Sequence, residues 1–188
     1  MTLGEKIRFC PGCGSPSVRT PNHRAFSCDN CGFEFFLNTA PTVAGLILDG
    51  RDPEQILLIR RGRDPAKGKL AFPGGFVDPE ENAEEALRRE VREELGLSIE
   101  IDRYLCSLPN NDLYRGTVYP VLDLFFVAST DRFAQPRIRS SEVLEISWRF
   151  LNSGVEKELA FPSMQAACKI LQHGAISPTG DCRAPRQR

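Results

Sequence analysis

Apolar and polar residues follow two different periods along the chain, and each period predicts one type of secondary structure. Four apolar runs have the composition and length of β-strands, at residues 41–48, 55–60, 119–128 and 145–151. The turn-forming segment 49–53 separates the first two runs. Further along, apolar residues recur every four positions, which predicts one amphipathic helix with its stripe on Ala83, Leu87, Val91 and Leu95.

The ends of this helix are also visible in the sequence. Asn82, followed three residues later by Glu85, has the spacing of a capping box, in which the two residues satisfy each other's free backbone amides. Gly96 is typical of the position after the last helical residue, because glycine adopts a left-handed conformation there easily. A second helix is predicted to begin at Pro162, with an apolar stripe on Met164, Ala167, Cys168 and Leu171.

Strands that surround one central helix, with another helix at the end, predict an α/β sandwich built on a mixed sheet. We expect a small N-terminal module at residues 1–38 and the α/β domain at residues 39–173. Residues 174–188 contain Pro, Gly and Arg without apolar periodicity, which predicts a disordered tail.

Composition and charge narrow the class of protein. Hydrophobic residues make up 41% of the 188 residues, enough for a packed core. The formal net charge of −1 gives no attraction to nucleic acid, so we do not expect nucleic acid as a partner. The N-terminus lacks the apolar segment of a signal peptide, and no apolar run approaches the length of a membrane span. We therefore expect a cytoplasmic protein without membrane contact; a homodimer is left open.

Four of the seven cysteines form two Cys-x-x-Cys pairs, each followed by glycine, at Cys10, Cys13, Cys28 and Cys31. Four thiolates at this spacing are typical of a tetrahedral structural zinc site. A module this short cannot build a sufficient core, so the metal would stabilise its fold. A redox dithiol or a disulfide pair is the alternative. The other cysteines are scattered, which fits free thiols in a reducing compartment.

The helix that begins after Asn82 also carries the main candidate chemistry. Glu90 lies one turn from both Glu93 and Glu94, so three carboxylates share one region of the helix surface. Carboxylates this close repel one another and raise their pKa values unless a cation lies between them. Their hard oxygen ligands favour Mg²⁺ or Mn²⁺. A solvated acidic face without metal is the alternative interpretation.

The same segment resembles a Nudix box, on a set of residues with the family's spacing: Gly75, Glu81, Arg89, Glu90, Val91, Glu93, Glu94, Gly96 and Leu97. The resemblance implies the Nudix α/β/α sandwich with a mixed sheet, here preceded by a small zinc ribbon. It also implies metal-dependent hydrolysis of a nucleoside diphosphate linked to another group. The metal ligands would be Glu90, Glu93, Glu94 and the carbonyl of Gly74, while Arg89 would pair with Glu81 and orient the preceding loop.

Two further groups of candidates lie outside the box. In Nudix enzymes the general base is a box glutamate or a glutamate on a later loop, so Glu142 is a catalytic candidate here and Glu145 an alternative. Either side chain is also consistent with an ordinary solvated loop charge. In the basic segment before the box, we expect Arg61, Arg63 and Lys69 to contact substrate phosphates. A basic loop that only keeps the protein soluble is the alternative.

The substrate within the family is the least determined feature. A four-cysteine module before a Nudix domain resembles the NADH pyrophosphatases, but only Ser107 and Pro109 match their S-Q-P-W-P-F-P-x-S motif. The run 61–70 looks most like ADP-ribose pyrophosphatase-type proteins, so we expect cleavage of ADP-ribose to AMP and ribose 5-phosphate. NADH, FAD and diadenosine polyphosphates are the alternative substrates. Two other classes stay open: an ADP-ribose-sensing regulator, and a ribbon that binds RNA or a partner protein.

Overall fold

The computed structural model describes residues 6–22, 25–131 and 133–173. The chain divides into two compact units, one formed by Met1–Ala40 with Asn111–Val121 and the other by Pro41–Asn110 with Leu122–Arg188. The tail predicted at residues 174–188 lies outside the described residues.

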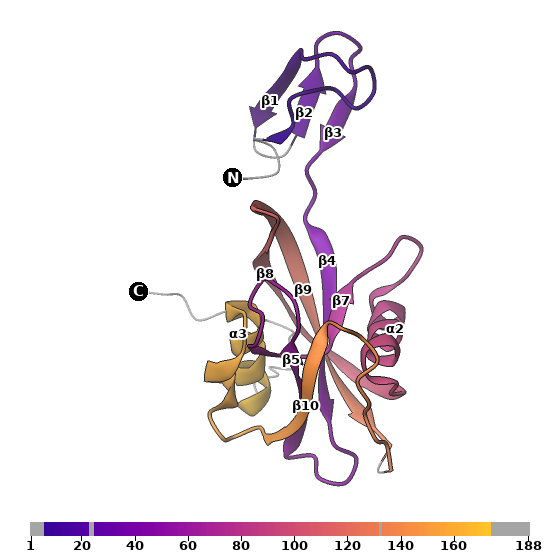
Figure 1. The fold of residues 1–188 in the computed structure, drawn as a ribbon, viewed down its shortest axis with the longest axis vertical. Helices are drawn as coiled ribbons and strands as arrows, with labels where there is room; N and C mark the ends of the chain where they lie inside the picture. The colour runs from indigo at the N-terminus through magenta and orange to yellow at the C-terminus, as the bar shows by residue number, and fades with distance from the viewer. Residues whose placement is uncertain (1–5, 23–24, 132, 174–188) are drawn as a thin grey trace. The chain divides into compact units, whose positions relative to one another are not determined.

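The first unit contains a small antiparallel sheet with strand order β1-β2-β3, formed by Val18–Asn22, Ala25–Cys28 and Glu34–Phe36 (Figure 1). Phe26 is its buried aromatic residue, and its ring lies 5.4 Å from that of Phe35 and 6.3 Å from that of Phe33. Phe33 and Phe35 themselves are substantially exposed. So small a cluster gives little stabilisation, which agrees with a unit that depends on metal.

A larger sheet, most of which belongs to the second unit, has the strand order β10-β5-β4-β9-β8. The strands are β4 (Ala40–Leu48), β5 (Gln55–Arg61), β8 (Ile99–Tyr114), β9 (Thr117–Thr130) and β10 (Val143–Phe150). Two short strands join it, β6 (Leu70–Ala71) beside β5 and β7 (Gly74–Phe76) beside β4. The pairing of β7 with β4 fixes the Gly-Gly segment against the middle of the sheet.

Two helices cover opposite faces of this sheet, α2 (Ala83–Leu95) and α3 (Pro162–Gln172), with the short 3-10 helix η1 (Val155–Glu158) before α3 (Figure 1). In β4 the residues Val43, Ala44, Leu46 and Ile47 are all buried. A strand that is apolar on both faces needs cover on both sides, and the two helices provide it. The predicted α/β class, with a helix at each face, is confirmed.

The ends of α2 follow the sequence prediction. The capping box of Asn82 and Glu85 is confirmed, because each side chain accepts a hydrogen bond from the other residue's backbone N–H, at 2.9 and 3.0 Å. Gly96 ends the helix with a left-handed φ of 63°. Leu87, Val91 and Leu95 are fully buried in the core, whereas Ala83 is only partly covered.

The long strand β8 was not predicted. Its sequence contains Pro109, Asn110 and Asn111, which break the apolar alternation that identifies a strand. Arg115 and Gly116, both with positive φ, form the tight turn that leads from β8 into β9. Pairing with β9 therefore determines this strand, more than its own residue preferences do.

Among the described helices, none combines the length and apolarity that a bilayer crossing requires.

Candidate active site

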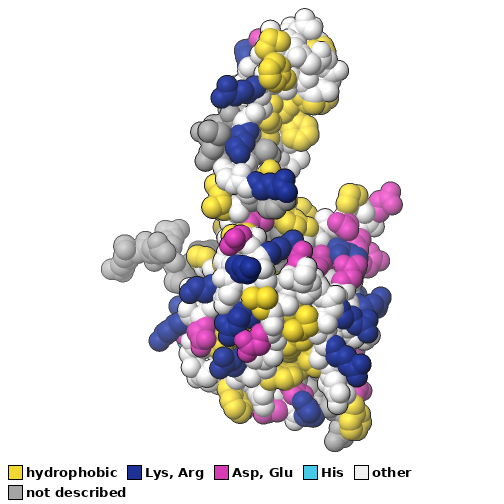
Figure 2. All heavy atoms as spheres, viewed as in Figure 1, with side chains coloured by type: hydrophobic (Ala, Val, Ile, Leu, Met, Phe, Trp, Pro, Cys, Tyr) yellow, Lys and Arg dark blue, Asp and Glu magenta, His cyan; other side chains and the backbone are white. Residues whose placement is uncertain are grey.

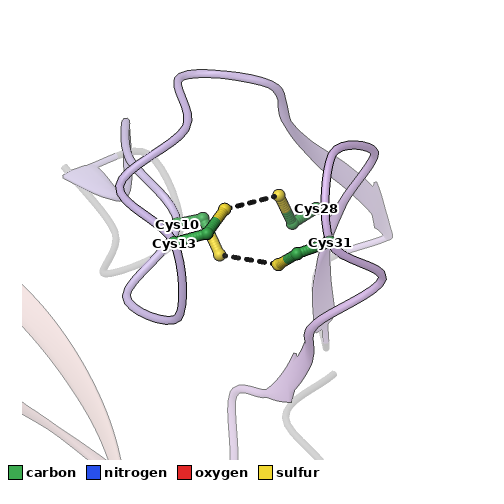
Figure 3. A group of neighbouring side chains, drawn as sticks. All are labelled: Cys10, Cys13, Cys28 and Cys31. Atoms are coloured by element: carbon green, nitrogen blue, oxygen red, sulfur yellow. Dashed lines mark hydrogen bonds between the residues drawn. The ribbon is translucent and has the colours of Figure 1, made fainter.

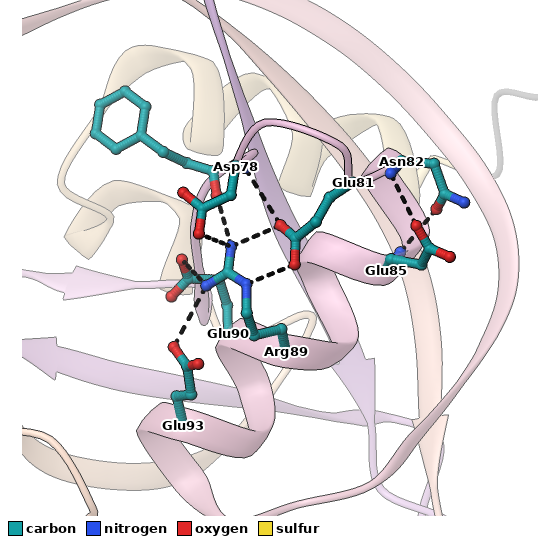
Figure 4. Close-up of polar contacts among 8 residues, drawn as sticks. Asp78, Glu81, Asn82, Glu85, Arg89, Glu90 and Glu93 are labelled. Atoms are coloured by element: carbon teal, nitrogen blue, oxygen red, sulfur yellow. Dashed lines mark hydrogen bonds and ion pairs between the residues drawn. The ribbon is translucent and has the colours of Figure 1, made fainter.

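Arg89 is the centre of a polar network that joins α2 to the loop before it (Figure 4). Its Nε and Nη2 atoms donate to the two carboxylate oxygens of Glu81 at 2.7 and 2.9 Å, and Nη2 also donates to the carbonyl of Phe76 at 3.0 Å. Nη1 donates to Glu90 at 2.9 Å and to Glu93 at 3.3 Å. The bidentate contact holds Arg89 and Glu81 in one relative orientation. The loop that begins at Phe76 is therefore tied to the carboxylate-bearing turn of α2.

Glu93, Glu90 and Glu94 lie at increasing depth, in that order, although they share one turn of α2. Glu93 is 60% exposed, Glu90 is mostly buried, and Glu94 is only 6% exposed. The backbone N–H of Gly74 donates to Glu94 at 3.2 Å. Figure 2 shows acidic side chains gathered over α2 and its preceding loop, with basic side chains beside them. The helix therefore presents carboxylates both to solvent and to the interior.

The two glycines of the F-P-G-G segment are needed for close approach. A Cβ at Gly74, whose φ is 147°, would overlap the Val43 carbonyl, and a Cβ at Gly75 would overlap the carboxyl group of Glu90. Strand β7 therefore brings bare backbone directly against the carboxylates of α2. Gly74 therefore lies against Glu94, and Gly75 against Glu90.

Burial is the main reason why the two inner carboxylates resist ionisation. It raises the pKa of Glu94 to about 8; the Gly74 N–H opposes the rise, and the charges of Glu90 and Glu142 add to it. Burial likewise raises the pKa of Glu90, against the opposing effect of Arg89. The sequence suggested mutual repulsion as the origin of such raised pKa values, but desolvation is the larger cause. The ion pair with Arg89 lowers the pKa of Glu81, so that residue stays ionised.

A second loop brings Glu142 to the same region. The backbone N–H groups of Arg137 and Arg139 donate to the carbonyls of Leu95 and Glu94, each at 2.9 Å, and so satisfy the last turn of α2. This contact anchors the loop that ends at Glu142. Glu142 in turn forms an ion pair with Arg63, with Nη1 and Oε1 2.6 Å apart.

The donor set at α2 fits a hard divalent cation. It offers carboxylate oxygens from the box helix and a carbonyl from a glycine that lies against them, which are the ligands preferred by Mg²⁺ and Mn²⁺. A buried carboxylate such as Glu94 costs free energy when it ionises, and a bound cation would offset that cost. The residues that would hold the metal are Glu90, Glu93, Glu94 and the Gly74 carbonyl, as the resemblance implies.

The other predicted candidates lie in different surroundings. Arg61 donates from Nε to the Pro65 carbonyl at 2.9 Å, and its guanidinium lies 5.0 Å from the ring centre of Phe161, so it supports the basic loop. Lys69 is exposed on that loop. Glu145 pairs with Arg60 at 2.6 Å across the β5–β10 ladder.

In the first unit, the four predicted cysteine ligands converge (Figure 3). Their sulfur atoms all lie within 4.8 Å of one another, and the Sγ–Sγ distances Cys10–Cys31 and Cys13–Cys28 are both 3.7 Å. Sulfur atoms about 3.8 Å apart are expected around zinc with Zn–S bonds of about 2.3 Å. The cluster therefore fits zinc.

One polar cluster was not predicted from the sequence. The buried carboxylate of Asp123 on β9 accepts hydrogen bonds from Thr42 at 2.5 Å, Ser163 at 2.6 Å and Asn110 at 3.0 Å. These donors come from β4, α3 and β8. A lone polar residue inside an apolar strand was the available signal, and its partners depend on tertiary contacts.

Comparison with known proteins places this arrangement in a family. The NUDIX domain model matches residues 38–162. A solved NUDIX hydrolase from Nitrosomonas europaea superposes with a TM-score of 0.65 at 22% identity, covering 89% of this chain and 94% of that chain. The MutT NUDIX hydrolase of Burkholderia pseudomallei gives 0.56 at 27% identity, covering 72% and 97%. The chain therefore belongs to the Nudix hydrolases, and the predicted Nudix fold with a mixed sheet is confirmed.

Curated relatives within the family carry one recurring name. The chain is 32% identical over 143 residues to the NAD-capped RNA hydrolase NudC of Deinococcus radiodurans, covering 75% of this chain and 48% of the relative. It is 36% identical over 100 residues to NudC of Stutzerimonas stutzeri, covering 53% and 35%. It is also 36% identical over 118 residues to the NAD-capped RNA hydrolase of Schizosaccharomyces pombe, covering 55% and 31%. The chain thus spans less than half the length of each of these relatives.

Proposed function

We propose that this protein hydrolyses the pyrophosphate bond of an NAD-type dinucleotide, using divalent metal held by α2 and β7. The observation that carries the proposal is the convergence of Glu90 and Glu94 with the Gly74–Gly75 backbone, with Glu93 joined to the same cluster through Arg89. Bound divalent cations would neutralise the pyrophosphate and acidify a water molecule. The network of Arg89 and Glu81 would hold the carboxylates in place while this charge is accommodated.

Glu142 is the proposed general base. It lies on a loop tied to the last turn of α2, and its charge affects both inner carboxylates. Its alternative, Glu145, is engaged with Arg60 and pairs across the sheet ladder. Arg63 and Lys69 remain the proposed contacts to substrate phosphates, because both side chains are exposed on the basic loop. For Arg61 the same role would require the loss of its contacts to Pro65 and Phe161.

The relatives' names support an NAD-type substrate. They also support nucleic acid as a substrate, contrary to the expectation from net charge, because NAD-capped RNA carries the same pyrophosphate bond. ADP-ribose is the second candidate. The NADH pyrophosphatase motif places tryptophan where this chain has Asn110, and the Asn110 side chain donates to Asp123 at 3.0 Å. The loop around Arg61–Leu70 adds to the resemblance with ADP-ribose pyrophosphatases.

A substrate panel tests the proposal. We would measure kcat/KM with Mg²⁺ for NADH, NAD-capped RNA, ADP-ribose, FAD and diadenosine polyphosphates. The proposal predicts that NADH or NAD-capped RNA exceeds the others. A preference for ADP-ribose of about tenfold or more, a difference of roughly 1.4 kcal/mol, would favour the second candidate. Micromolar binding of ADP-ribose without hydrolysis of any substrate would instead favour the sensor.

Zinc in the cysteine cluster is proposed as a structural ion. The four sulfur atoms close one coordination shell, so no position is left for substrate. Metal analysis of the purified protein should give about one zinc per chain.

A further inference from the structure

Arg63 and Glu142 form an ion pair that the proposed reaction does not by itself explain. The pair is only partly exposed to solvent, with 54% of the Arg63 side chain and 38% of the Glu142 side chain accessible. Arg63 follows β5 and Glu142 precedes β10, so the pair lies at the end of the β5–β10 ladder.

The backbone of Glu142 is held without help from Arg63. Its carbonyl accepts a hydrogen bond from the Gly62 N–H at 2.6 Å, and its own N–H donates to the Ser140 hydroxyl at 3.2 Å. A Cβ at Gly62 would meet the Ser141 carbonyl at 2.5 Å, so the two backbones are in direct contact. The ion pair is therefore not needed to place Glu142, and its main effect is on charge.

The loop that carries Glu142 is held against the carboxylate-bearing helix. The backbone N–H of Arg139, three residues before Glu142, donates to the Glu94 carbonyl at 2.9 Å. A guanidinium that stabilises a carboxylate cluster opposes the binding of another cation to the same cluster, because both satisfy the same negative charge.

We propose that Arg63 is an exchangeable counter-ion: it neutralises Glu142 while the metal site is empty, and its guanidinium moves to a substrate phosphate when a divalent cation binds the neighbouring carboxylates of α2. The planar guanidinium fits phosphate oxygens as well as carboxylate oxygens. The long, half-exposed side chain of Arg63 allows this movement without a change in the backbone. The phosphate half of the proposal rests on the proposed function.

Metal binding without nucleotide tests the first half. The variant Arg63→Gln would be titrated with Mn²⁺ by calorimetry, in protein dialysed free of other divalent cations and verified to retain its zinc. Loss of one partly exposed positive charge should lower the Kd for Mn²⁺ by roughly three- to tenfold, and less so at high salt. An unchanged or higher Kd would overturn the proposal.

Arg60→Gln is the matched control. Arg60 also forms an ion pair across the same ladder, with Glu145 at 2.6 Å, and it donates to the Gly68 carbonyl of the basic loop. Its partner Glu145 lies within β10 and not on the loop that is hydrogen-bonded to α2. Its replacement should leave the Kd for Mn²⁺ unchanged; a decrease equal to that of Arg63→Gln would assign the effect to the loop and overturn the proposal.

Kinetics at saturating Mg²⁺ tests the phosphate half. Arg63→Gln should raise the KM for NADH by about tenfold, the effect of one lost phosphate contact, and Arg63→Lys should recover part of it. An unchanged KM would refute the transfer to phosphate even if metal binding becomes tighter. If the unmodified protein hydrolyses no nucleotide in the panel, the proposed function fails, while the Mn²⁺ titrations still decide the competition.

Discussion

Replacing Glu94 by Gln should stabilise the protein at pH 8 in the absence of divalent cations, even though it removes a proposed metal ligand. Burial raises the pKa of this carboxyl from 4.5 to about 8, so the folded state favours the protonated form. The contribution of Glu94 to the free energy of unfolding is therefore fully present below pH 4.5. It is lost as the pH rises towards 8, because Glu94 ionises more readily in the unfolded chain than in the folded protein. Glutamine has the same shape and carries no such cost.

The size of the effect follows from the difference between the pKa values of Glu94 in the folded and unfolded chain. A tenfold change in an ionisation constant corresponds to about 1.4 kcal/mol, so the whole difference sets an upper bound of about 5 kcal/mol. Part of the free-energy cost of burying Glu94 is already present at pH 5, because the unfolded chain begins to ionise there. Local relaxation of the structure around Glu94 reduces the remaining cost. We therefore expect Glu94→Gln to gain about 2–3 kcal/mol over the unmodified protein between pH 5 and pH 8.

Urea unfolding followed by tryptophan fluorescence measures this directly. Trp148 on β10 is the only tryptophan, so its signal reports on the α/β unit. Glu93→Gln is the matched control, because that side chain is 60% exposed and has no comparable burial to relieve. At pH 8, Mg²⁺ should raise the free energy of unfolding of the unmodified protein far more than it raises that of the Glu94→Gln variant. A difference between Glu94→Gln and the unmodified protein that is the same at both pH values would refute the reasoning.

Three other changes have distinct expected outcomes. Glu90→Gln should lower kcat on the order of 100-fold or more with an unchanged fold, since it removes a charged metal ligand; near-normal turnover would contradict the metal assignment. Cys13→Ser should lose the bound zinc and unfold the first unit, as seen by metal analysis and proteolysis, and a variant that keeps a full zinc would contradict the site. Gly75→Ala should weaken Mn²⁺ binding with little change in Tm, because the Glu90 side chain can turn away from the new Cβ. Gly74→Ala should lower Tm clearly, because its Cβ would overlap the backbone of Val43, which cannot move aside. Equal Tm values for the two glycine variants would argue against this geometry.

The parts of the fold that depend on local spacing could be predicted from the sequence. Helix α2, its capping box and its carboxylate-bearing turn rest on residues three or four positions apart, and such neighbours meet on any helix. The cysteine cluster was predictable for a related reason, because each Cys-x-x-Cys pair forms its own turn. Strand β8 was missed because its polar residues hide the alternation, and only the pairing with β9 shows it.

The arrangement around the carboxylates depends on tertiary contacts, which the sequence does not show. Arg63 and Glu142 were each named as candidates, but nothing in their spacing indicated that they pair with each other. The depth of Glu94 is equally hidden, because Glu93 beside it is exposed. For this reason the sequence suggested repulsion as the cause of the raised pKa values, whereas burial is the larger cause.

The most direct test of the central claim is product analysis after incubation of the protein with NADH and Mg²⁺. Hydrolysis by water should cleave the pyrophosphate to give AMP and reduced nicotinamide mononucleotide in equal amounts. Chelation of Mg²⁺, or the replacement Glu94→Gln, should abolish both products. Intact NADH after incubation with the unmodified protein, or the same products from Glu94→Gln at an equal rate, would show that this site is not a metal-dependent pyrophosphatase for NADH.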